Sequence, residues 1–182
     1  MHDMKKTILS KINQFFYLRP AKLRSSSLVT LKPMTQAEFE DFLKISVPHY
    51  VSELMEARNH RFEDARVLAE KSFRSLFPDN RVDSPDQFVY SIMDEEVAVG
   101  YLHLGIRREM QQPYLYVWDI LINPTHRGRG YGKQAMLLAE KKGAEWGLMS
   151  LRLNVFRHNK AAMNLYQKIG FKTESMMMSK PI

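Results

Sequence analysis

The sequence predicts an α+β domain in which a mixed central β-sheet is flanked by helices on both faces. Segments with strand-like and helix-like hydrophobic patterns follow one another in an irregular order, which favours a mixed sheet over a purely parallel one. A chain of 182 residues with 45% hydrophobic content can bury one core of ordinary size. We therefore expect one globular domain over residues 28–182, preceded by a basic extension over residues 1–27.

The first half of the domain is expected to contain one short strand and three helices, over residues 28–31, 35–44, 48–59 and 62–77. Thr35 and Glu38 have the spacing of a capping box, in which each residue satisfies a free N–H group at the start of a helix. Pro48 marks the start of the second helix, and Pro78 follows the third.

The second half is expected to contain a hairpin of residues 87–93 and 97–107, strands over residues 114–123 and 149–156, helices over residues 131–146 and 159–169, and a final strand from Phe171. The hairpin turns across Asp94, Glu95 and Glu96, which separate two β-patterned segments. The segment 114–123 ends at Pro124 and leads into a glycine-rich turn before the next helix.

That turn, residues 127–133, is the most informative stretch of the chain. A strand, a glycine-rich turn and a helix start direct several backbone N–H groups toward one point, where the helix dipole adds positive partial charge. Arg127, Arg129 and Lys133 add full charges. Glycines permit positive φ angles and leave room for an anion. The turn therefore predicts a pyrophosphate site.

Two common phosphate-binding motifs fit this turn poorly. A Walker A motif would require glycine at Arg127 and serine or threonine at Gln134. The dinucleotide fingerprint matches at Gly130, Gly132 and Ala135, but no Asp or Glu lies between Gly147 and Thr173 to hold a ribose. A nucleotide-dependent oxidoreductase is therefore a distant alternative.

A third pattern fits better. Arg127, Gly130 and Gly132 form an Arg-x-x-Gly-x-Gly signature that resembles the acetyl-CoA motif of the GNAT N-acetyltransferase superfamily. A second block, residues 151–162 with Leu165-Tyr166 and Gly170-Phe171, resembles the family's later strand, helix and closing Gly-Phe pair. The two blocks cover residues 114–171 in the family's order, and the chain is most similar to small uncharacterised bacterial members. The resemblance implies a GNAT-like sheet and an N-acetyltransferase.

The resemblance also implies which residues hold acetyl-CoA, the acyl-donor cosubstrate. Its pyrophosphate is expected at the turn, formed by Arg127, Gly128, Arg129, Gly130, Tyr131, Gly132 and Lys133. The pantetheine arm is expected along the main chain of Ile120, Leu121 and Ile122, as an added strand would lie. A backbone N–H near Leu121 is expected to stabilise the oxyanion, which is worth roughly 3 kcal/mol. Asn159 is expected to contact the cofactor, to cap the helix that follows it, or both.

Tyr166 is the expected general acid, since a phenol is protonated at pH 7 and can donate to the departing thiolate. From helical spacing alone, a packing role beside Leu165 and Ile169 is favoured, and only the resemblance reverses this. Some relatives carry a glutamate where this chain has Asn154, and an amide cannot accept the amine's proton. Asp119 is the acidic alternative, as a base or as a charge that anchors the amine. A buried, satisfied carboxylate explains it equally well.

The acceptor is expected at the early helices, where Tyr50, Glu53, Glu56 and His60 lie. They form either an acidic pocket for a cationic amine or a solvated face, and we favour the solvated face. The histidines show no paired ligand spacing, so no metal is expected. Partners are expected to be a small-molecule or peptide amine, with no nucleic acid, no stable membrane insertion and a homodimer left open.

The net charge of +7 is concentrated in residues 1–27, which carry six Lys/Arg and one acid. That segment is interpreted as a flexible extension, with an amphipathic surface helix as the alternative. The absence of cysteine excludes an acyl-cysteine intermediate and fits a cytoplasmic protein. The sequence thus predicts direct acetyl transfer from acetyl-CoA to a primary amine in a ternary complex. A non-catalytic acyl-CoA-sensing domain is the main alternative.

Overall fold

The computed structural model describes residues 28–58, 60–109, 112–178 and 180, so the predicted extension over residues 1–27 lies outside the described residues. Within them, five strands form one sheet in sequence order: β1 (Thr30–Pro33), β2 (Gln87–Asp94), β3 (Val97–Arg107), β4 (Tyr114–Ile122) and β5 (Leu151–Leu153). The first four strands pair antiparallel and β5 pairs parallel to β4. The predicted mixed sheet is confirmed.

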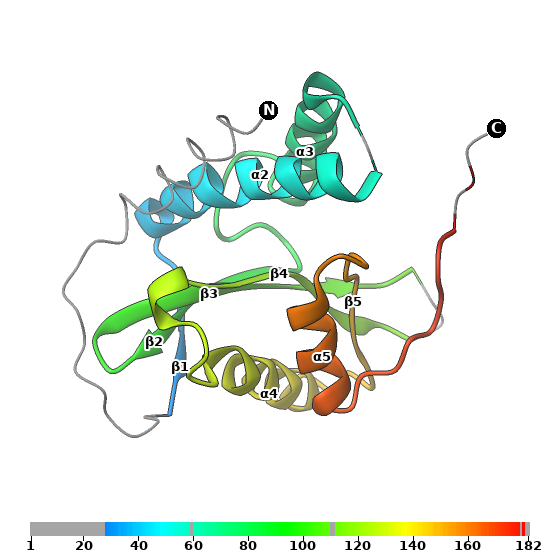
Figure 1. Ribbon diagram of the computed structural model, residues 1–182. Helices are drawn as coiled ribbons and strands as arrows, with labels where there is room; N and C mark the ends of the chain where they lie inside the picture. Colours follow the sequence, from blue (N-terminus) through cyan, green and yellow to red (C-terminus); the bar gives the residue numbers. More distant parts are fainter. Residues whose placement is uncertain (1–27, 59, 110–111, 179, 181–182) are drawn as a thin grey trace.

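The helices cover both faces of this sheet (Figure 1). They are α2 (Gln36–Arg58), α3 (Phe62–Leu76), the short 3₁₀ helix η1 (Pro124–His126), α4 (Tyr131–Glu145) and α5 (Lys160–Lys168). The pair α2 and α3 lies on one face, and α4 and α5 lie on the other (Figure 1). No helix in the described ranges has the length and apolarity that crossing a bilayer would require.

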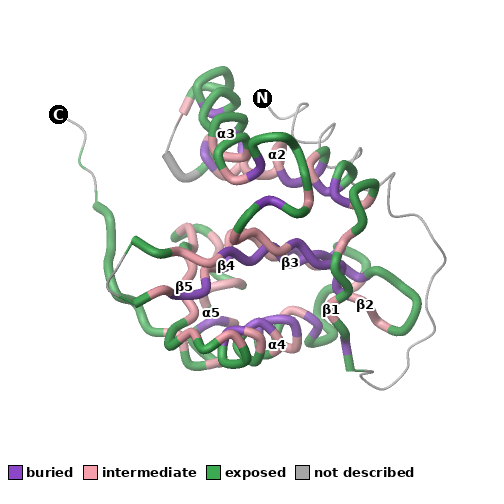
Figure 2. Tube along the Cα trace, turned by 180° about the vertical axis from the view of Figure 1, so that it is seen from behind, coloured by how far each residue is buried: buried purple, intermediate pink, exposed green. Residues whose placement is uncertain are grey.

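Each face of the sheet has its own buried core. Toward α4 and α5, the core includes Leu102, Leu104 and Leu115, none of which is exposed to solvent. Toward α2, a second cluster joins the helix residues Phe39 and Phe42 to Tyr101 and Leu121 of the sheet. Burial runs along β3 and β4 between the two helix layers (Figure 2). The sheet is therefore the middle of three layers, as an α+β domain requires.

The structure corrects the prediction for the first two helices, which are one continuous helix, α2. Pro48 lies inside it and removes one helical hydrogen bond, at a cost of about 3 kcal/mol. Lys44, whose carbonyl loses its donor, is exposed, so water can replace that bond. Burial of Phe42 and Ile45 before the proline, and of Leu54 after it, outweighs the cost.

The predicted final strand from Phe171 is wrong, because residues 171–178 are not in a strand. Phe171 packs against Tyr166, and residues 172–178 are then exposed. β5 is also shorter than the predicted 149–156, since only Leu151–Leu153 pairs with β4. A strand-like pattern expresses a preference that depends on context, so it does not by itself predict that the segment will pair.

The remaining elements agree with the predictions to within one or two residues. The hairpin of β2 and β3 turns at Glu95, which has a φ of 54°. The segments β4, α4 and α5 begin and end within one residue of the predicted bounds. Thr35 and Glu38 form the predicted capping box, in which the Thr35 N–H donates to the Glu38 carboxylate at 2.7 Å.

Candidate functional site

The strand β4 is paired on both edges in its first half and on one edge in its second half. From Leu115 to Val117 it pairs with both β3 and β5. From Asp119 to Ile122 it pairs with β3 alone, because the contact with β5 ends at Leu153. The edge of β4 that faces away from β3 is therefore open beyond Val117, immediately before the glycine-rich turn.

A β-bulge separates the two halves of β4. His103 pairs with Asp119 and Leu104 pairs with Val117, so Trp118 is the extra residue. Before the bulge, Leu115 and Val117 face the α4 side; after it, Leu121 faces the α2 side. Regular alternation would have put these odd-numbered residues on one face. The bulge therefore turns Asp119 toward α2, where Ser46 donates to its Oδ2 atom at 2.8 Å.

The backbone groups on the open edge can be identified from the register. Asn123 N–H donates to Val99 O at 2.9 Å, which fixes the side of β4 that faces β3. By alternation, the Leu121 N–H also faces β3, and the N–H groups of Ile120 and Ile122 face the open edge. Arg127 Nε donates to Ile122 O at 3.0 Å, as expected for a carbonyl on the open side. An added chain would thus meet Ile120 and Ile122 rather than Leu121.

The turn after η1 has the backbone geometry that an anion site needs. Gly128 and Gly130 have φ angles of 76° and 82°, and a Cβ atom at either would find no other atom within 4 Å. Gly130 is the N-cap of α4, and its carbonyl accepts the Gln134 N–H at 3.1 Å. The N–H groups of Tyr131, Gly132 and Lys133 precede that first helical bond, so they are available to a ligand.

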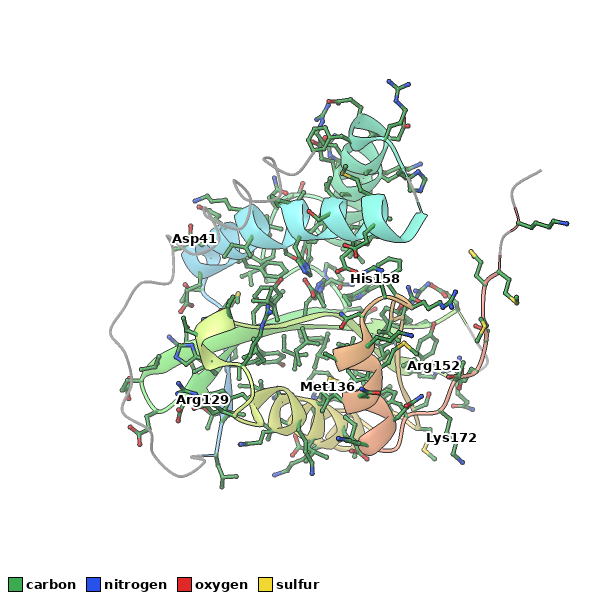
Figure 3. All side chains as sticks on the ribbon, in the orientation of Figure 1. Asp41, Arg129, Met136, Arg152, His158 and Lys172 are labelled. Atoms are coloured by element: carbon green, nitrogen blue, oxygen red, sulfur yellow. The ribbon has the colours of Figure 1, made fainter. Side chains whose placement is uncertain are left out.

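Around the turn, one side chain is buried and holds the helix in place, and the basic side chains are exposed to solvent. The Tyr131 hydroxyl donates to Asp94 Oδ2 at 2.5 Å, which ties the start of α4 to the β2–β3 hairpin. Tyr131 is buried, so only its backbone can face a cofactor. Arg127, Arg129 and Lys133 are not buried, and Figure 3 shows Arg129 at the start of α4. The predicted cationic turn is therefore accessible to an anion.

The helix α5 begins after Asn159 and carries Tyr166, which belongs to the buried cluster against which Ile120 and Ile122 of the open half pack. The Asn159 side chain accepts the Ala162 N–H at 3.1 Å, which confirms its capping role. Tyr166 is 8% exposed and packs against Phe171. Burial, together with the negative charge of Asp119, raises the pKa of the Tyr166 hydroxyl to about 12. The packing interpretation of Tyr166 is therefore confirmed.

Asp119 is held by two neutral hydroxyl groups. Ser46 Oγ of α2 and Tyr101 Oη of β3 each donate to Oδ2 at 2.8 Å. Burial and the charge of Asp119 raise the pKa of Tyr101 well above its ordinary value, so this hydroxyl remains a donor. In the hydrogen bonds of the described residues, Oδ1 of Asp119 has no protein donor, and the carboxylate forms no ion pair.

Glu53 corrects the expectation of a solvated face on the early helices. Its side chain is 21% exposed, and its carboxylate lies 3.3 Å from Nε2 of His158, on the loop between β5 and α5. His49 lies 4.0 Å from the same carboxylate, one helical turn earlier. Figure 3 shows His158 between α2 and α5. Glu53 therefore connects α2 to the loop that precedes α5. Glu56 is exposed, as expected.

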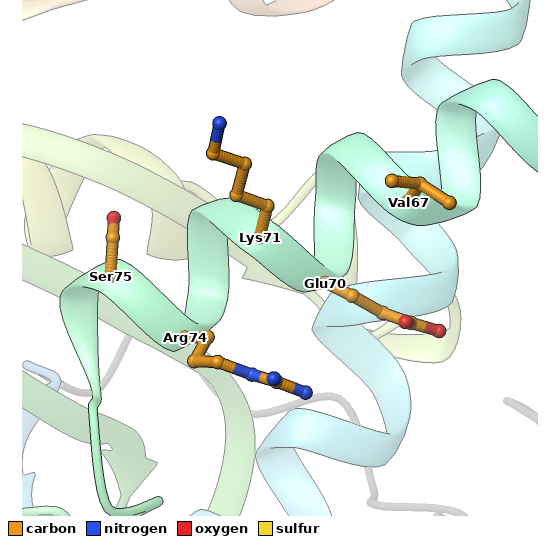
Figure 4. Close-up of a pocket in the computed structure, with 5 residues that line it drawn as sticks. All are labelled: Val67, Glu70, Lys71, Arg74 and Ser75. Atoms are coloured by element: carbon orange, nitrogen blue, oxygen red, sulfur yellow. The ribbon is translucent and has the colours of Figure 1, made fainter.

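A depression on α3 lies outside this arrangement. Figure 4 shows a shallow depression lined by Val67, Glu70, Lys71, Arg74 and Ser75. All five residues come from α3, and none belongs to β4, α5 or the turn. Within the described ranges, no group of three or more His, Asp or Glu side chains has the arrangement of a metal site. Asn154 is exposed just beyond β5.

Sequence reasoning missed Ser46, Tyr101 and the pairing of Glu53 with His158. Ser46 was visible as one polar residue between Ile45 and Val47, in a stretch that buries Phe42 and Ile45. A buried serine in such a stretch needs an acceptor, which could have suggested a polar contact. Its partner Asp119 lies 73 positions away, so the sequence carried no sign of the pair.

Comparison with known proteins identifies the family to which this geometry corresponds. The model of the acetyltransferase (GNAT) family matches residues 50–171. The uncharacterised N-acetyltransferase YycN of Bacillus subtilis is 31% identical over 155 residues, which cover 85% of this chain and 99% of that protein. The crystal structure of YycN covers 85% of this chain and 98% of its own, with a TM-score of 0.78.

Two further relatives extend this comparison. The uncharacterised N-acetyltransferase YdgE of Bacillus subtilis is 27% identical and covers 84% of this chain and 98% of that protein. Streptothricin acetyltransferase of Escherichia coli is 30% identical, with 71% of this chain and 80% of that protein covered.

Proposed function

The chain belongs to the acetyltransferase (GNAT) family and is an N-acetyltransferase, and we propose that it transfers the acetyl group of acetyl-CoA directly to a primary amine. The observation that carries the proposal is the open edge of β4, which runs from Asp119 to the cationic turn. Tyr166 belongs to the buried cluster against which Ile120 and Ile122 of this edge pack. One elongated ligand with a phosphate end and a reactive end would fill that arrangement. Acetyl-CoA supplies the acetyl thioester there.

The turn fits a pyrophosphate. The free space beside Gly128 and Gly130 allows oxygen atoms to approach the main chain, and the first N–H groups of α4 point into it. Arg127, Arg129 and Lys133 would add positive charge. Asn159 uses its carboxamide oxygen to cap α5, which leaves its NH₂ group to donate to the ligand.

The open half of β4 fits a pantetheine arm. The amide groups of such an arm would pair with the main chain at Ile120 and Ile122, as a short added strand does. The backbone N–H of one of these residues would also stabilise the oxyanion that forms on the attacked carbonyl, in the role first assigned to the neighbourhood of Leu121. The Leu121 side chain is buried against α2 instead.

Tyr166 is the group we assign to protonation of the departing thiolate. Its raised pKa keeps the hydroxyl protonated across the neutral and moderately alkaline range, so it can act as a donor. The hydroxyl belongs to a side chain that packs on Phe171, and this packing holds the ring in one place. The phenol is therefore both a core residue and a proton donor.

Asp119 is the group we assign to the amine. Most alkylamines arrive protonated because their pKa lies near about 10, so the amine must be bound as a cation and then lose a proton. Asp119 offers a half-buried negative charge for the first task and an acceptor oxygen for the second. Asn154 cannot take over the second task, since an amide does not accept a proton at neutral pH.

The acceptor class follows from relatives and charge. Streptothricin acetyltransferase is named for an antibiotic acceptor, and we carry over from it only the expectation of a small amine. Asp119 and Glu53 give the α2 side of the site negative charge, which favours a cation. We propose a soluble cytoplasmic enzyme with a small-molecule or peptide amine as acceptor and no metal. The chain has no cysteine, which favours direct transfer over a covalent acyl-enzyme.

A thermal unfolding series tests the cofactor. A ligand that binds only the native state raises the unfolding temperature, so acetyl-CoA and CoA should each stabilise the protein and NAD should not. Amines would then be screened for thiol release from acetyl-CoA. Stabilisation without turnover by any amine would favour a domain that senses acyl-CoA. No stabilisation by either CoA species would contradict the proposed site.

A further inference from the structure

The strongest unassigned feature beside the reacting centre is the pair of hydroxyls that hold Asp119. Ser46 is fully buried in α2, and Tyr101 is 2% exposed in β3. They come from different elements and reach the same oxygen, Oδ2, at the same distance of 2.8 Å. The arrangement therefore depends on three elements together: α2 supplies Ser46, β3 supplies Tyr101, and the bulge in β4 turns Asp119 toward both.

The convergence leaves the two oxygens of Asp119 with different surroundings. A carboxylate oxygen accepts about two hydrogen bonds, so Oδ2 is saturated by Ser46 and Tyr101. Oδ1 has no donor within the described part of the chain, and it is the oxygen left for a ligand. Because both hydroxyls are neutral, they fix the carboxylate without cancelling its charge.

We propose that Ser46 and Tyr101 are positioning residues, which orient Asp119 so that Oδ1 meets the cationic acceptor amine. The proposal rests on the proposed function, because it deepens the role given there to Asp119. Neither hydroxyl touches the reacting atoms, and each acts through Asp119. The arrangement also explains why α2 matters to the acceptor: it supplies one of the two donors.

The expected consequence is a selective loss of amine binding. Without these hydrogen bonds the Asp119 carboxylate samples several rotamers, so binding of the amine must also restrict it to one, and this loss of entropy weakens binding. Ser46→Ala and Tyr101→Phe should each raise the amine KM by about tenfold, which is the usual effect of one hydrogen bond to a charged group. The KM for acetyl-CoA should change less than about twofold, because the turn and the open edge are untouched.

Matched controls separate positioning from general damage. Ser84→Ala removes another buried serine hydroxyl, which donates to Arg81 O in a loop away from β4. Tyr90→Phe removes a tyrosine hydroxyl from β2, where the ring packs on the α4 side. Both controls should leave the amine KM unchanged. Thermal unfolding of all four variants, with and without acetyl-CoA, would verify that each is folded and binds the cofactor.

A double-mutant cycle gives the decisive measurement. Because Asp119→Asn is expected to lose turnover, the dissociation constant of the amine would be measured in both backgrounds by calorimetric titration of the CoA-bound protein. In the Asp119→Asn background, Ser46→Ala should change this constant by less than about twofold, since the group that the hydroxyl orients has been altered. An equal effect of Ser46→Ala in both backgrounds would overturn the proposal, and so would turnover with wild-type amine KM in both single variants. Failure of the wild-type protein to acetylate any amine would instead overturn the proposed function, and this proposal with it.

Discussion

The two halves of β4 differ in how many of their edges are paired: two before Trp118 and one after it. From Leu115 to Val117, both edges are hydrogen-bonded, and Leu115 is completely buried. From Asp119 to Ile122, one edge is open, and the residues beside it are only half-buried apart from Leu121. A closed strand contributes stability, whereas an open strand offers backbone donors to a ligand. The bulge at Trp118 marks the change from one use to the other.

The difference shows how a rigid scaffold can present an unsatisfied edge. An unpaired strand edge inside a sheet costs stability and invites unwanted pairing. Here the closed half anchors the strand, and the Arg127 side chain, which follows η1, donates to Ile122 O at the end of the open half. The cost of the open edge is therefore confined to a few residues, at the place where acetyl-CoA is proposed to bind.

The largest expected effect comes from blocking the turn beside the open half. Gly130→Glu would place a negative side chain where phosphate is expected and would strain a residue with a φ of 82°. Acetyl-CoA affinity should fall by more than about 100-fold. Calorimetric titration with acetyl-CoA would measure it.

Gly147→Glu is the matched control for this substitution. Gly147 also has a positive φ, of 71°, and open space beside it, but it follows α4 instead of preceding it. The control carries the same backbone strain and the same added charge. If both variants lost acetyl-CoA equally, the effect would come from strain and not from the anion site.

The next effect should appear in the closed half and should concern stability alone. Leu115→Ala would remove a fully buried side chain that contacts Gly143 of α4 and lies between β3 and β5. We expect a loss of about 3 kcal/mol in the free energy of unfolding, measured by urea denaturation. Acetyl-CoA affinity and kcat of the folded variant should stay within about twofold of wild type. A large change in either would show that the two halves are not separable.

A catalytic effect without a binding effect is expected at Tyr166. Tyr166→Phe should lower kcat by about 100-fold, since it removes the proposed donor to the thiolate, and acetyl-CoA affinity should remain within about threefold. Tyr114→Phe, in the closed half of β4, is the control, because it removes a hydroxyl from another buried tyrosine. Steady-state kinetics of both variants would compare them. Wild-type turnover in Tyr166→Phe would remove Tyr166 as the acid.

The smallest expected effect is the contribution of Tyr166 to the pH dependence of kcat. A proton donor is lost as the pH rises through its pKa, and burial raises that pKa to about 12. Activity should therefore rise as the amine deprotonates, from about pH 7 to about pH 10, with no descending limb due to Tyr166. A pH profile of kcat would measure this. A decrease in kcat between about pH 7 and about pH 10 that is absent in Tyr166→Phe would contradict the raised pKa of Tyr166.

Local features were predictable because short stretches of sequence decide them. The glycines at positions 128 and 130 do adopt the positive φ angles that the turn required. Asn159 does cap its helix, and the hairpin does turn at Glu95. Each depends on contacts within a few residues, where turn and capping rules apply. The resemblance to the GNAT family also follows from the sequence alone, because its two motifs occur in the family's order and separation.

The first failures came where tertiary burial overrides a local signal. Pro48 is a helix-breaking signal, yet α2 continues through it because residues on both sides are buried. The segment after Phe171 has strand-forming residues but pairs with no strand, although Glu174 lies 3.7 Å from Arg152 of β5. In both places the local preference is smaller than the free energy that the surrounding structure supplies or withholds.

The sequence by itself determined the family, the mixed sheet and the cationic turn, since these follow from motifs and periodicity. Only the tertiary structure decided what Asp119 faces. One extra residue, Trp118, turns Asp119 to the α2 side, where Ser46 and Tyr101 meet it from elements 73 and 18 positions away. Strand alternation is a local rule, whereas a bulge depends on how two paired strands meet. The chemistry of the acceptor side is therefore set by packing between distant segments.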